Sequence, residues 1–445
     1  MNIDIKAGIE KFKSSEITHN IATLSAGSVI SQIIPVVMSL ILSRLYTPKD
    51  YGDFSIFINC AGIIAVFISL RYEYAIVRPK RNVDAFNLIT LCGIIAISIS
   101  IILTLLFILS DWMDLDTINS LPGKNWLPIY IICIATLQIF SNYANRVENY
   151  KVLAISSITR SLAQAFSRII FGILHYGTGL ITGSIIGLLG GCLTFTRKIH
   201  LLRSLRRCFS WKRIKELMQI YNNFPKYLLP SGLLNTLSTN LPVILLADFY
   251  AKDSIGHFSM AISILYLPIS LIGNALGQVF YKKASSWQPR QTNALAIQFL
   301  TLNSVIGLIT FGILLSGGER LFMFLLGKDW SIVGLYAIYL CPWLISVLCI
   351  SPLGWIFDAR DQQRTEMYLN IGMFVSRTFV ILLGGYLQLS FDITLLLYSI
   401  TGLFLWLIEG VFIYRVLEIK ASNTQKILIL TYICFILICW LIRIW

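Results

Sequence analysis

Charged residues are scarce in this chain. Only 13% of its 445 residues are charged, whereas 56% are hydrophobic, and the mean hydropathy is +0.74. Because soluble domains carry about 25% charged residues, this composition excludes a soluble globular protein. The apolar residues form long runs, and a helix needs roughly 20 such residues to cross a bilayer. The sequence therefore predicts an all-α polytopic membrane protein.

Residue patterns that hold metals or perform catalysis are also lacking. The four histidines are scattered, and the nine cysteines have neither zinc-ligand nor CxxC spacing. No P-loop and no serine–histidine–aspartate arrangement is visible. We therefore expect no metal, no cofactor and no enzymatic activity. The net charge of +14 is typical of cytoplasmic loops in a membrane protein, so we expect no nucleic-acid partner.

Apolar segments of spanning length recur along the chain. They lie at about 21–44, 54–77, 86–110, 127–146, 152–174, 179–196, 226–247, 256–280, 294–316, 332–357, 368–388 and 393–415. A further apolar run, 427–444, is a candidate additional transmembrane helix. The polar segment 1–20 carries no cleavage site and is not read as a signal peptide. With this N-terminus in the cytoplasm, the cytoplasmic loops hold most of the 36 Lys and Arg, as the positive-inside rule requires.

One stretch of the chain is repeated. LYTPKDYGDFS at 45–55 returns as FYAKDSIGHFS at 249–259, a displacement of 204 residues. GKNW at 123–126 returns as GKDW at 327–330 with the same displacement. Two matches at one displacement indicate a duplicated unit.

The duplication predicts the architecture. Each copy holds six helices, and an even number means that both copies enter the membrane in the same direction. We expect two six-helix bundles, 21–196 and 226–416, in parallel pseudo-repeat around a central cavity. The basic linker 197–225 either lies on anionic lipid or binds a cytoplasmic partner. In the repeated motif, Gly52 and Gly256 are expected to permit tight turns.

Polar residues form a stripe on the predicted helix 152–174. Arg160, Gln164 and Arg168 fall on one face at 100° per residue, and the two arginines lie about 12 Å apart along the axis. Charges inside a membrane usually face a cavity or a partner. The stripe is predicted to form a positive ladder lining the cavity. Alternatively, Arg168 reaches the interface and Arg160 pairs with a carboxylate.

Other polar residues extend this predicted lining. Arg71 and Glu73 are two positions apart on the predicted helix 54–77, so they should not face each other; anchoring at the interface is the alternative for Arg71. Further cavity candidates are Asn235, Asn274, Gln278 and Arg377, although amides also serve ordinary interhelical hydrogen bonds. Glu73 and Glu409 are candidates for proton coupling. Because buried arginines outnumber carboxylates, the cavity should select an anionic substrate.

Several stretches resemble one family of transporters. These are LYTPKDYG, LRYEYAIV at 70–77, YNNFPKYLLPSGLLNTLSTNLPVILLADFY at 221–250, and LLGKDW with PWL and SPLG within 325–354. In order and spacing they resemble bacterial oligosaccharide (O-antigen) flippases, in the polysaccharide-transport branch of the MOP exporter superfamily. The resemblance implies a MATE-like fold with two bundles around a cavity, working by alternating access.

The resemblance also implies a substrate and a location. An undecaprenyl-diphosphate-linked oligosaccharide, such as an O-antigen or other surface-polysaccharide repeat unit, would pass from the cytoplasmic to the periplasmic leaflet of the bacterial inner membrane. Basic cavity residues would hold the diphosphate or acidic sugars, here Arg71, Arg160, Arg168 and Arg377. Partners would be membrane lipids and the polymerase and chain-length regulator of the glycan pathway. The alternatives are a membrane glycosyltransferase or polymerase of the same pathway and a multidrug-type antiporter.

Overall fold

A computed structural model describes residues 26–198, 208–286, 289–360 and 362–418. The predicted segment 1–20 and the candidate helix 427–444 lie outside these residues. Every regular element in the described part is helical. Eight of these helices are long and apolar enough to cross a membrane, and Ala26–Leu42 and Gly179–Phe195 are shorter apolar helices. The chain is thus an all-helical, multi-pass membrane protein, as its composition predicts.

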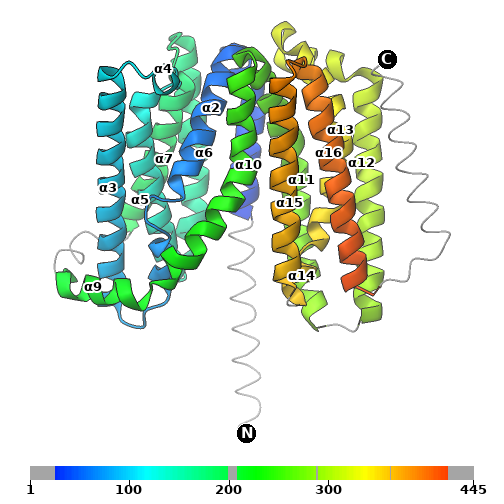
Figure 1. The fold of residues 1–445 in the computed structure, drawn as a ribbon. Helices are drawn as coiled ribbons and strands as arrows, with labels where there is room; N and C mark the ends of the chain where they lie inside the picture. Colours follow the sequence, from blue (N-terminus) through cyan, green and yellow to red (C-terminus); the bar gives the residue numbers. More distant parts are fainter. Residues whose placement is uncertain (1–25, 199–207, 287–288, 361, 419–445) are drawn as a thin grey trace. The chain divides into compact units, whose positions relative to one another are not determined.

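The chain forms two compact units (Figure 1). The first comprises Met1–Leu45 and Ile56–Thr236, and the second comprises Tyr46–Ser55 and Leu237–Trp445. Two helices are therefore divided between units: α2 (Pro48–Ala65) and α10 (Leu229–Phe249). The division thus falls inside helices rather than only at the basic linker.

The helices of the first unit form one connected bundle. Its other elements are η1 (Tyr72–Val77), α3 (Asn82–Trp112), α4 (Asp116–Asn119), η2 (Lys124–Trp126), α5 (Leu127–Arg146), α6 (Tyr150–Ile173), α7 (Gly179–Lys198), α9 (Trp211–Ile220) and η3 (Phe224–Leu228). α6 packs along α7, and α3 packs along α5 and η1. α6 begins at an N-cap, Asn149, whose side chain accepts a hydrogen bond from the Val152 amide at 3.3 Å.

α9 lies across the end of α3 instead of beside it (Figure 1). Its buried residues Ile214 and Leu217 join the apolar cluster beneath α3 and η1. The Arg213 guanidinium donates to both carboxylate oxygens of Asp84, at 2.7 and 2.9 Å. The hydrogen bonds that Arg213 donates to Asp84 and Glu216 raise the pKa of Arg213 above its ordinary value, so this clamp remains charged. α9 is therefore an integral part of the first unit.

The second unit is built around one buried helix. Its remaining elements are α11 (Lys252–Ser286), α12 (Pro289–Leu326), η4 (Lys328–Trp330), α13 (Ser331–Ile350), η5 (Ser351–Leu353), α14 (Ile356–Ala359), α15 (Gln363–Tyr386) and α16 (Phe391–Val416). α13 packs against α11, α12 and α16. Its sequence is apolar on all sides, which is typical of a fully buried helix, and nearly all of its residues from Val333 to Ile350 are buried.

The second predicted helix, 54–77, is interrupted. α2 ends at Ala65, and the chain continues through turns to the short 3-10 helix η1. Leu70 and Arg71 both adopt positive φ angles, of 49° and 65°, which are unusual for residues with a Cβ. The prediction of one continuous helix was wrong. The residues between α2 and η1 are also mostly apolar, so hydropathy gives no sign that the helix ends there.

The repeated motif packs against its own copy. A Cβ on Gly52 would collide with the Lys252 carbonyl, and a Cβ on Gly256 would collide with the Pro48 carbonyl. The Ser55 and Ser259 hydroxyls lie 2.6 Å apart and share a hydrogen bond. Both glycines lie inside helices, α2 and α11. The expectation of tight turns was therefore wrong, and the glycines permit close approach of two backbones.

Candidate functional site

Arg71 and Glu73 lie together at the break after α2. Arg71 Nη1 lies 3.9 Å from Glu73 Oε1 and donates to the Tyr74 hydroxyl at 3.2 Å. Ser69 donates to Glu73, which is only 2% exposed. The expectation that Arg71 and Glu73 do not face each other was wrong, because it assumed helical geometry and Arg71 has a left-handed conformation.

A notch in α10 receives the Arg71 side chain. A Cβ on Gly232 would come within 2.8 Å of Arg71 Cζ, so the missing side chain makes room for the guanidinium. Arg71 Nε is buried and has no hydrogen-bond partner among the described residues. The facing segment η3 is a π-helix, and such turns are frequent at functional sites. Asn235 lies about one turn beyond Gly232, with an exposed side chain.

The stripe on α6 faces α7. Arg168 is 8% exposed and donates from Nε to the Leu180 carbonyl at 3.2 Å and from Nη2 to Ser184 Oγ at 2.7 Å. With the Gln164 amide oxygen turned toward the guanidinium, Gln164 accepts from Arg168 at 2.7 and 3.1 Å. These contacts support a role for Arg168 and Gln164 in holding α6 to α7. Arg160 is half-buried.

Glycines on α7 explain this arrangement. A Cβ on Gly183 would lie 2.5 Å from Arg168 Cγ, one on Gly187 2.6 Å from Gln164 Cβ, and one on Gly191 3.3 Å from Arg160 Cβ. Small residues at every fourth position allow close helix approach in membranes. The spacing of Gly183, Gly187 and Gly191 was the sequence signal that could have assigned the α6 stripe to a helix–helix contact.

In the second unit, Arg377 on α15 lies against two aromatic rings. Its Cζ is 4.6 Å from the centroid of Trp343 and 5.5 Å from that of Tyr398, distances suited to cation–π interaction. Arg377 Nε and Nη2 are buried and unpaired within the described part of the chain, and so are Trp343 Nε1 and Ser399 Oγ. Buried donors without partners are rare and call for a ligand or water.

Glu409 on α16 is the buried carboxylate of this unit. It is 8% exposed and interacts electrostatically with both Arg377 and Glu366. Asn274 and Gln278 lie on α11, but their side chains are outside the described residues. Arg71, Glu73, Arg160, Gln164, Arg168 and Asn235 thus belong to the first unit, and Asn274, Gln278, Arg377 and Glu409 to the second.

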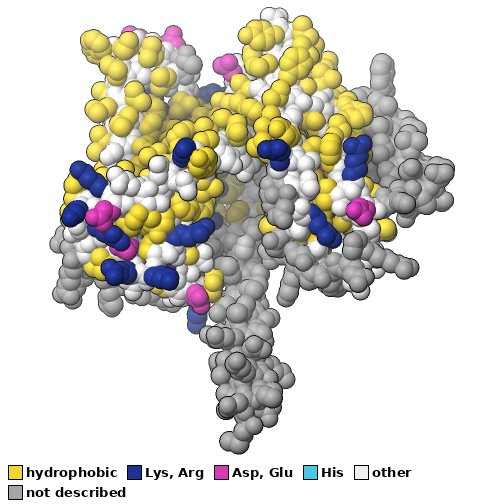
Figure 2. All heavy atoms as spheres, turned by 60° about the horizontal axis from the view of Figure 1, so that its bottom comes forward, with side chains coloured by type: hydrophobic (Ala, Val, Ile, Leu, Met, Phe, Trp, Pro, Cys, Tyr) yellow, Lys and Arg dark blue, Asp and Glu magenta, His cyan; other side chains and the backbone are white. Residues whose placement is uncertain are grey.

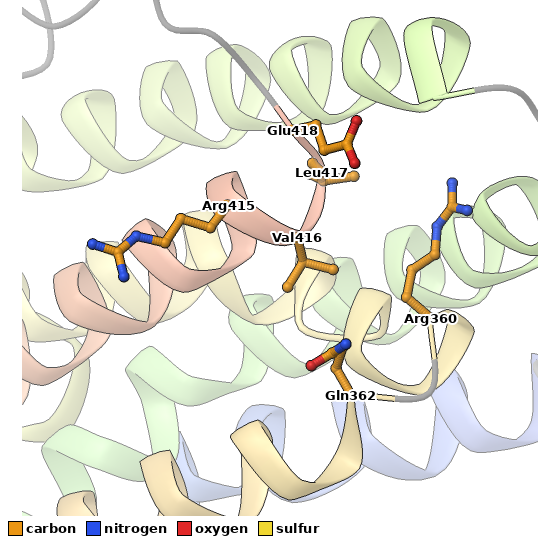
Figure 3. A pocket seen from close by; sticks show the side chains of 6 residues that line it. All are labelled: Arg360, Gln362, Arg415, Val416, Leu417 and Glu418. Atoms are coloured by element: carbon orange, nitrogen blue, oxygen red, sulfur yellow. The ribbon is translucent and has the colours of Figure 1, made fainter.

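A cavity of about 400 Å³ opens at the end of α16 (Figure 3). It is lined by Arg360, Gln362, Arg415, Val416, Leu417 and Glu418. The Arg415 guanidinium points away from Arg360 (Figure 3), so the two cations do not converge. The lining includes none of the predicted site residues. Among residues 26–198, 208–286, 289–360 and 362–418, no cluster of His, Cys, Asp or Glu could hold a metal ion.

The fold is that of the MOP transporter superfamily. A multidrug-resistance MATE transporter of that superfamily, in its inward-facing conformation, matches 88% of this chain and 96% of its own, with 13% identity and a TM-score of 0.62. Lipid II flippase MurJ in an inward closed conformation matches 94% of this chain and 97% of its own, with 17% identity and a TM-score of 0.61. These likenesses establish the MATE-like fold that the sequence predicts.

The family follows from the sequence itself. Residues 17–281, more than half of the chain, match the model of the polysaccharide biosynthesis protein family. The chain belongs to this family. It is also 22% identical over 378 residues to the capsular polysaccharide biosynthesis protein CapF of Staphylococcus aureus, a match that covers 79% of this chain and 88% of CapF.

Proposed function

We propose that this protein is a flippase for a lipid-linked oligosaccharide, specifically an undecaprenyl-diphosphate-linked repeat unit of a surface polysaccharide such as O-antigen or capsule. It moves this lipid from the cytoplasmic to the periplasmic leaflet of the inner membrane, with its N-terminus in the cytoplasm. The observation that carries the proposal is the family match over residues 17–281, because it connects a transporter fold with glycan assembly.

Buried N–H groups on two arginines support an anionic substrate. Arg71 in the first unit and Arg377 in the second each keep guanidinium N–H groups that are buried and unpaired within the described residues. A guanidinium binds phosphate oxygens through paired, charge-assisted hydrogen bonds. A diphosphate or an acidic sugar would satisfy these donors. Arg160 is a further candidate on α6.

Two carboxylates are proposed to couple transport to protons. Glu73 lies beside Arg71, and Glu409 interacts electrostatically with Arg377. Protonation of either carboxylate would free its arginine for the substrate. A pH gradient across proteoliposomes tests this coupling, which is abandoned if Glu73→Gln with Glu409→Gln leaves the gradient response unchanged.

Deletion of the gene tests the function directly. We expect complete undecaprenyl-linked repeat units to accumulate on the cytoplasmic leaflet while the surface glycan disappears. Incomplete repeat units would instead identify a glycosyltransferase, and an unchanged surface glycan would overturn the proposal.

Complementation then tests the arginines. Arg71→Ala and Arg377→Ala should lower glycan export by roughly tenfold or more, since losing a charge-assisted contact corresponds to about 1.5–3 kcal/mol. Arg377→Lys should retain more activity, because it keeps the charge. Arg415→Ala is a matched control, because its guanidinium lies over the Phe412 ring at 5.5 Å rather than in the candidate site. If Arg71→Ala and Arg377→Ala both export glycan normally at a normal protein level, Arg71 and Arg377 do not belong to the substrate site.

A further inference from the structure

α9 is a surface helix of the first unit, and its two sides differ. Ile214 and Leu217 are buried in the apolar cluster beneath α3 and η1. At 100° per residue, Lys212 and Lys215 fall on the opposite side of the helix, where both side chains are exposed. Neither lysine forms an ion pair within the described part of the chain. α9 therefore presents two unpaired cations to its surroundings.

The loop between η1 and α3 adds further cations beside α9. Arg78, Lys80 and Arg81 are exposed. Asp84 interacts electrostatically with Arg81 and is bonded to Arg213 of α9, which places this loop next to the helix. Because Asp84 is engaged by Arg213, it leaves the charge of the loop largely intact. We name these exposed cations the basic patch: Arg78, Lys80, Arg81, Lys212 and Lys215.

Exposed apolar side chains border the basic patch on α9. The Phe209 and Trp211 rings lie 6.3 Å apart and are both exposed, as are Met218 and Ile220. Aromatic rings beside lysines are typical of helices that lie in the plane of a membrane interface, where the rings enter the headgroup region and the cations meet anionic lipid. The combination of side chains on α9 therefore matches a lipid surface.

The place of α9 in the fold also favours lipid. α3 begins at Asn82 and is long and apolar enough to cross a membrane, and α9 packs across this beginning (Figure 1). Asn87 joins the two helices, because it donates to the Cys208 carbonyl at 2.9 Å and accepts from the Ser210 amide at 3.0 Å. The basic patch thus lies at the end of a spanning helix, the depth at which lipid headgroups are found.

α9 is bonded to the segment that carries Arg71 and Glu73. The Tyr72 hydroxyl donates to the Met218 carbonyl at 3.2 Å, and Tyr72 lies in the apolar cluster that buries α9. Tyr72 stands between the two candidate site residues in the sequence. α9 therefore holds the segment from which both of their side chains project.

We propose that α9 and the basic patch form a docking surface for anionic phospholipid headgroups, and that the bound lipid stabilises η1 with Arg71 and Glu73 in the observed arrangement. Each lysine or arginine near an anionic bilayer surface adds to the attraction, and the exposed rings of α9 enter the same interface. The docking surface does not depend on the proposed flippase function, because its ligand is bilayer lipid and not the transported substrate.

Hydrogen exchange in nanodiscs tests the docking surface. We expect the α9 amides to exchange about tenfold more slowly in discs of phosphatidylcholine with phosphatidylglycerol than in phosphatidylcholine alone, because bound lipid opposes local opening. High salt should shrink this difference, since it screens exposed charges. Equal exchange in the two kinds of disc would overturn the proposal and favour a cytoplasmic protein as the partner of the basic patch.

Neutralising the two lysines of α9 tests the role of charge. Lys212→Gln with Lys215→Gln should remove most of the lipid dependence of α9 exchange, whereas Lys212→Arg with Lys215→Arg should keep it, because both cations are attracted to anionic lipid. Lys49→Gln with Lys328→Gln is the matched control, since it removes two exposed lysines from α2 and η4 in the second unit. Full lipid dependence in the α9 glutamine variant would overturn the docking surface.

The same measurement on η1 tests whether bound lipid acts on the candidate site. The amides of 72–77 should exchange several-fold more slowly in discs with phosphatidylglycerol. Tyr72→Phe should weaken this effect while α9 stays protected, since it removes the hydrogen bond to Met218. Protection of α9 without any change in η1 would overturn the stabilisation of η1. Protection of both segments in a protein that translocates no oligosaccharide would overturn only the proposed function.

Discussion

At the scale of single residues, each unit keeps a guanidinium group with at least one buried N–H that no described residue accepts. Arg71 and Arg377 hold buried, unpaired N–H groups within the described chain, and such groups are destabilising by about 1–3 kcal/mol each. Arg168, in contrast, is fully engaged with α7. The two candidate binding arginines therefore differ from Arg168 in that some of their donors have no partner among the described residues.

The Gly232 notch should position Arg71. In Gly232→Ala, the new methyl group would collide with the end of the Arg71 side chain and displace its guanidinium. We expect glycan export to fall roughly tenfold, the effect of about 1.4 kcal/mol, with little change in thermal stability because the side chain can move. Gly93→Ala is the control, since a Cβ there meets no atom within 4 Å. Unchanged export with Gly232→Ala would remove Arg71 from the candidate site.

The sequence identified the charged residues of the candidate site, but it did not predict which groups these residues contact. Arg71, Glu73, Arg377 and Glu409 were identifiable because a charge inside an apolar run is conspicuous. Their contacts depend on features that apolar runs conceal. The reversal at Leu70 and Arg71 brings Arg71 toward Glu73, and the rings around Arg377 come from two other helices.

At the scale of elements, the contact of α6 with α7 depends on glycine spacing. In Gly187→Leu, the added side chain would start 2.6 Å from Gln164 Cβ and force the helices apart. We expect a loss of about 1–3 kcal/mol of stability or more, as for other overpacked interiors, measured as thermal unfolding in detergent. Gly93→Leu on α3 should unfold at the wild-type temperature, and a similar result for Gly187→Leu would contradict this contact.

The attachment of α9 depends on the clamp between Arg213 and Asp84. Figure 2 shows Lys and Arg side chains gathered on the end of the molecule where α9 lies. Phe209 and Trp211, each 52% exposed, are suited to the membrane interface. Asp84→Asn should increase hydrogen exchange of the α9 amides several-fold, because local opening governs exchange. Asp111→Asn, which weakens the exposed pair with Lys124, should leave α9 exchange unchanged; equal exchange in both variants would show that the clamp is dispensable.

The helix boundaries predicted from hydropathy agree with the structure where a helix is uniformly apolar. α16 (Phe391–Val416) closely matches the predicted segment 393–415. The prediction failed for 54–77, because apolar residues continue through the turn between α2 and η1. Hydropathy reports where a chain is buried in lipid, but it carries little information on local backbone reversal.

At the scale of the whole molecule, the duplicated sequence carries its charges asymmetrically. Arg71 and Glu73 correspond to Ala275 and Gly277 in the second copy, yet the second unit has its own arginine and carboxylate, Arg377 on α15 and Glu409 on α16. Each unit thus holds a half-buried arginine and a buried carboxylate at positions unrelated by the repeat. The arrangement of these charges therefore does not follow the repeat.

Combining the two arginine substitutions tests whether these sites act together. If Arg71 and Arg377 contribute independently, their free-energy effects on export should add. Two tenfold losses would then give about a hundredfold loss in Arg71→Ala with Arg377→Ala, measured as initial export rate in complemented cells. A double variant no worse than either single one would indicate that both arginines serve the same step.

The crossing of Gly52 and Gly256 also has a consequence for self-association. Each glycine meets the carbonyl that lies four residues before the other glycine, Lys252 or Pro48, and Ser55 meets Ser259. A self-complementary contact of this kind is what a two-fold symmetric homodimer makes. The self-complementary form of this contact is therefore the feature that would let a fragment carrying one copy of the motif associate with a second copy of itself.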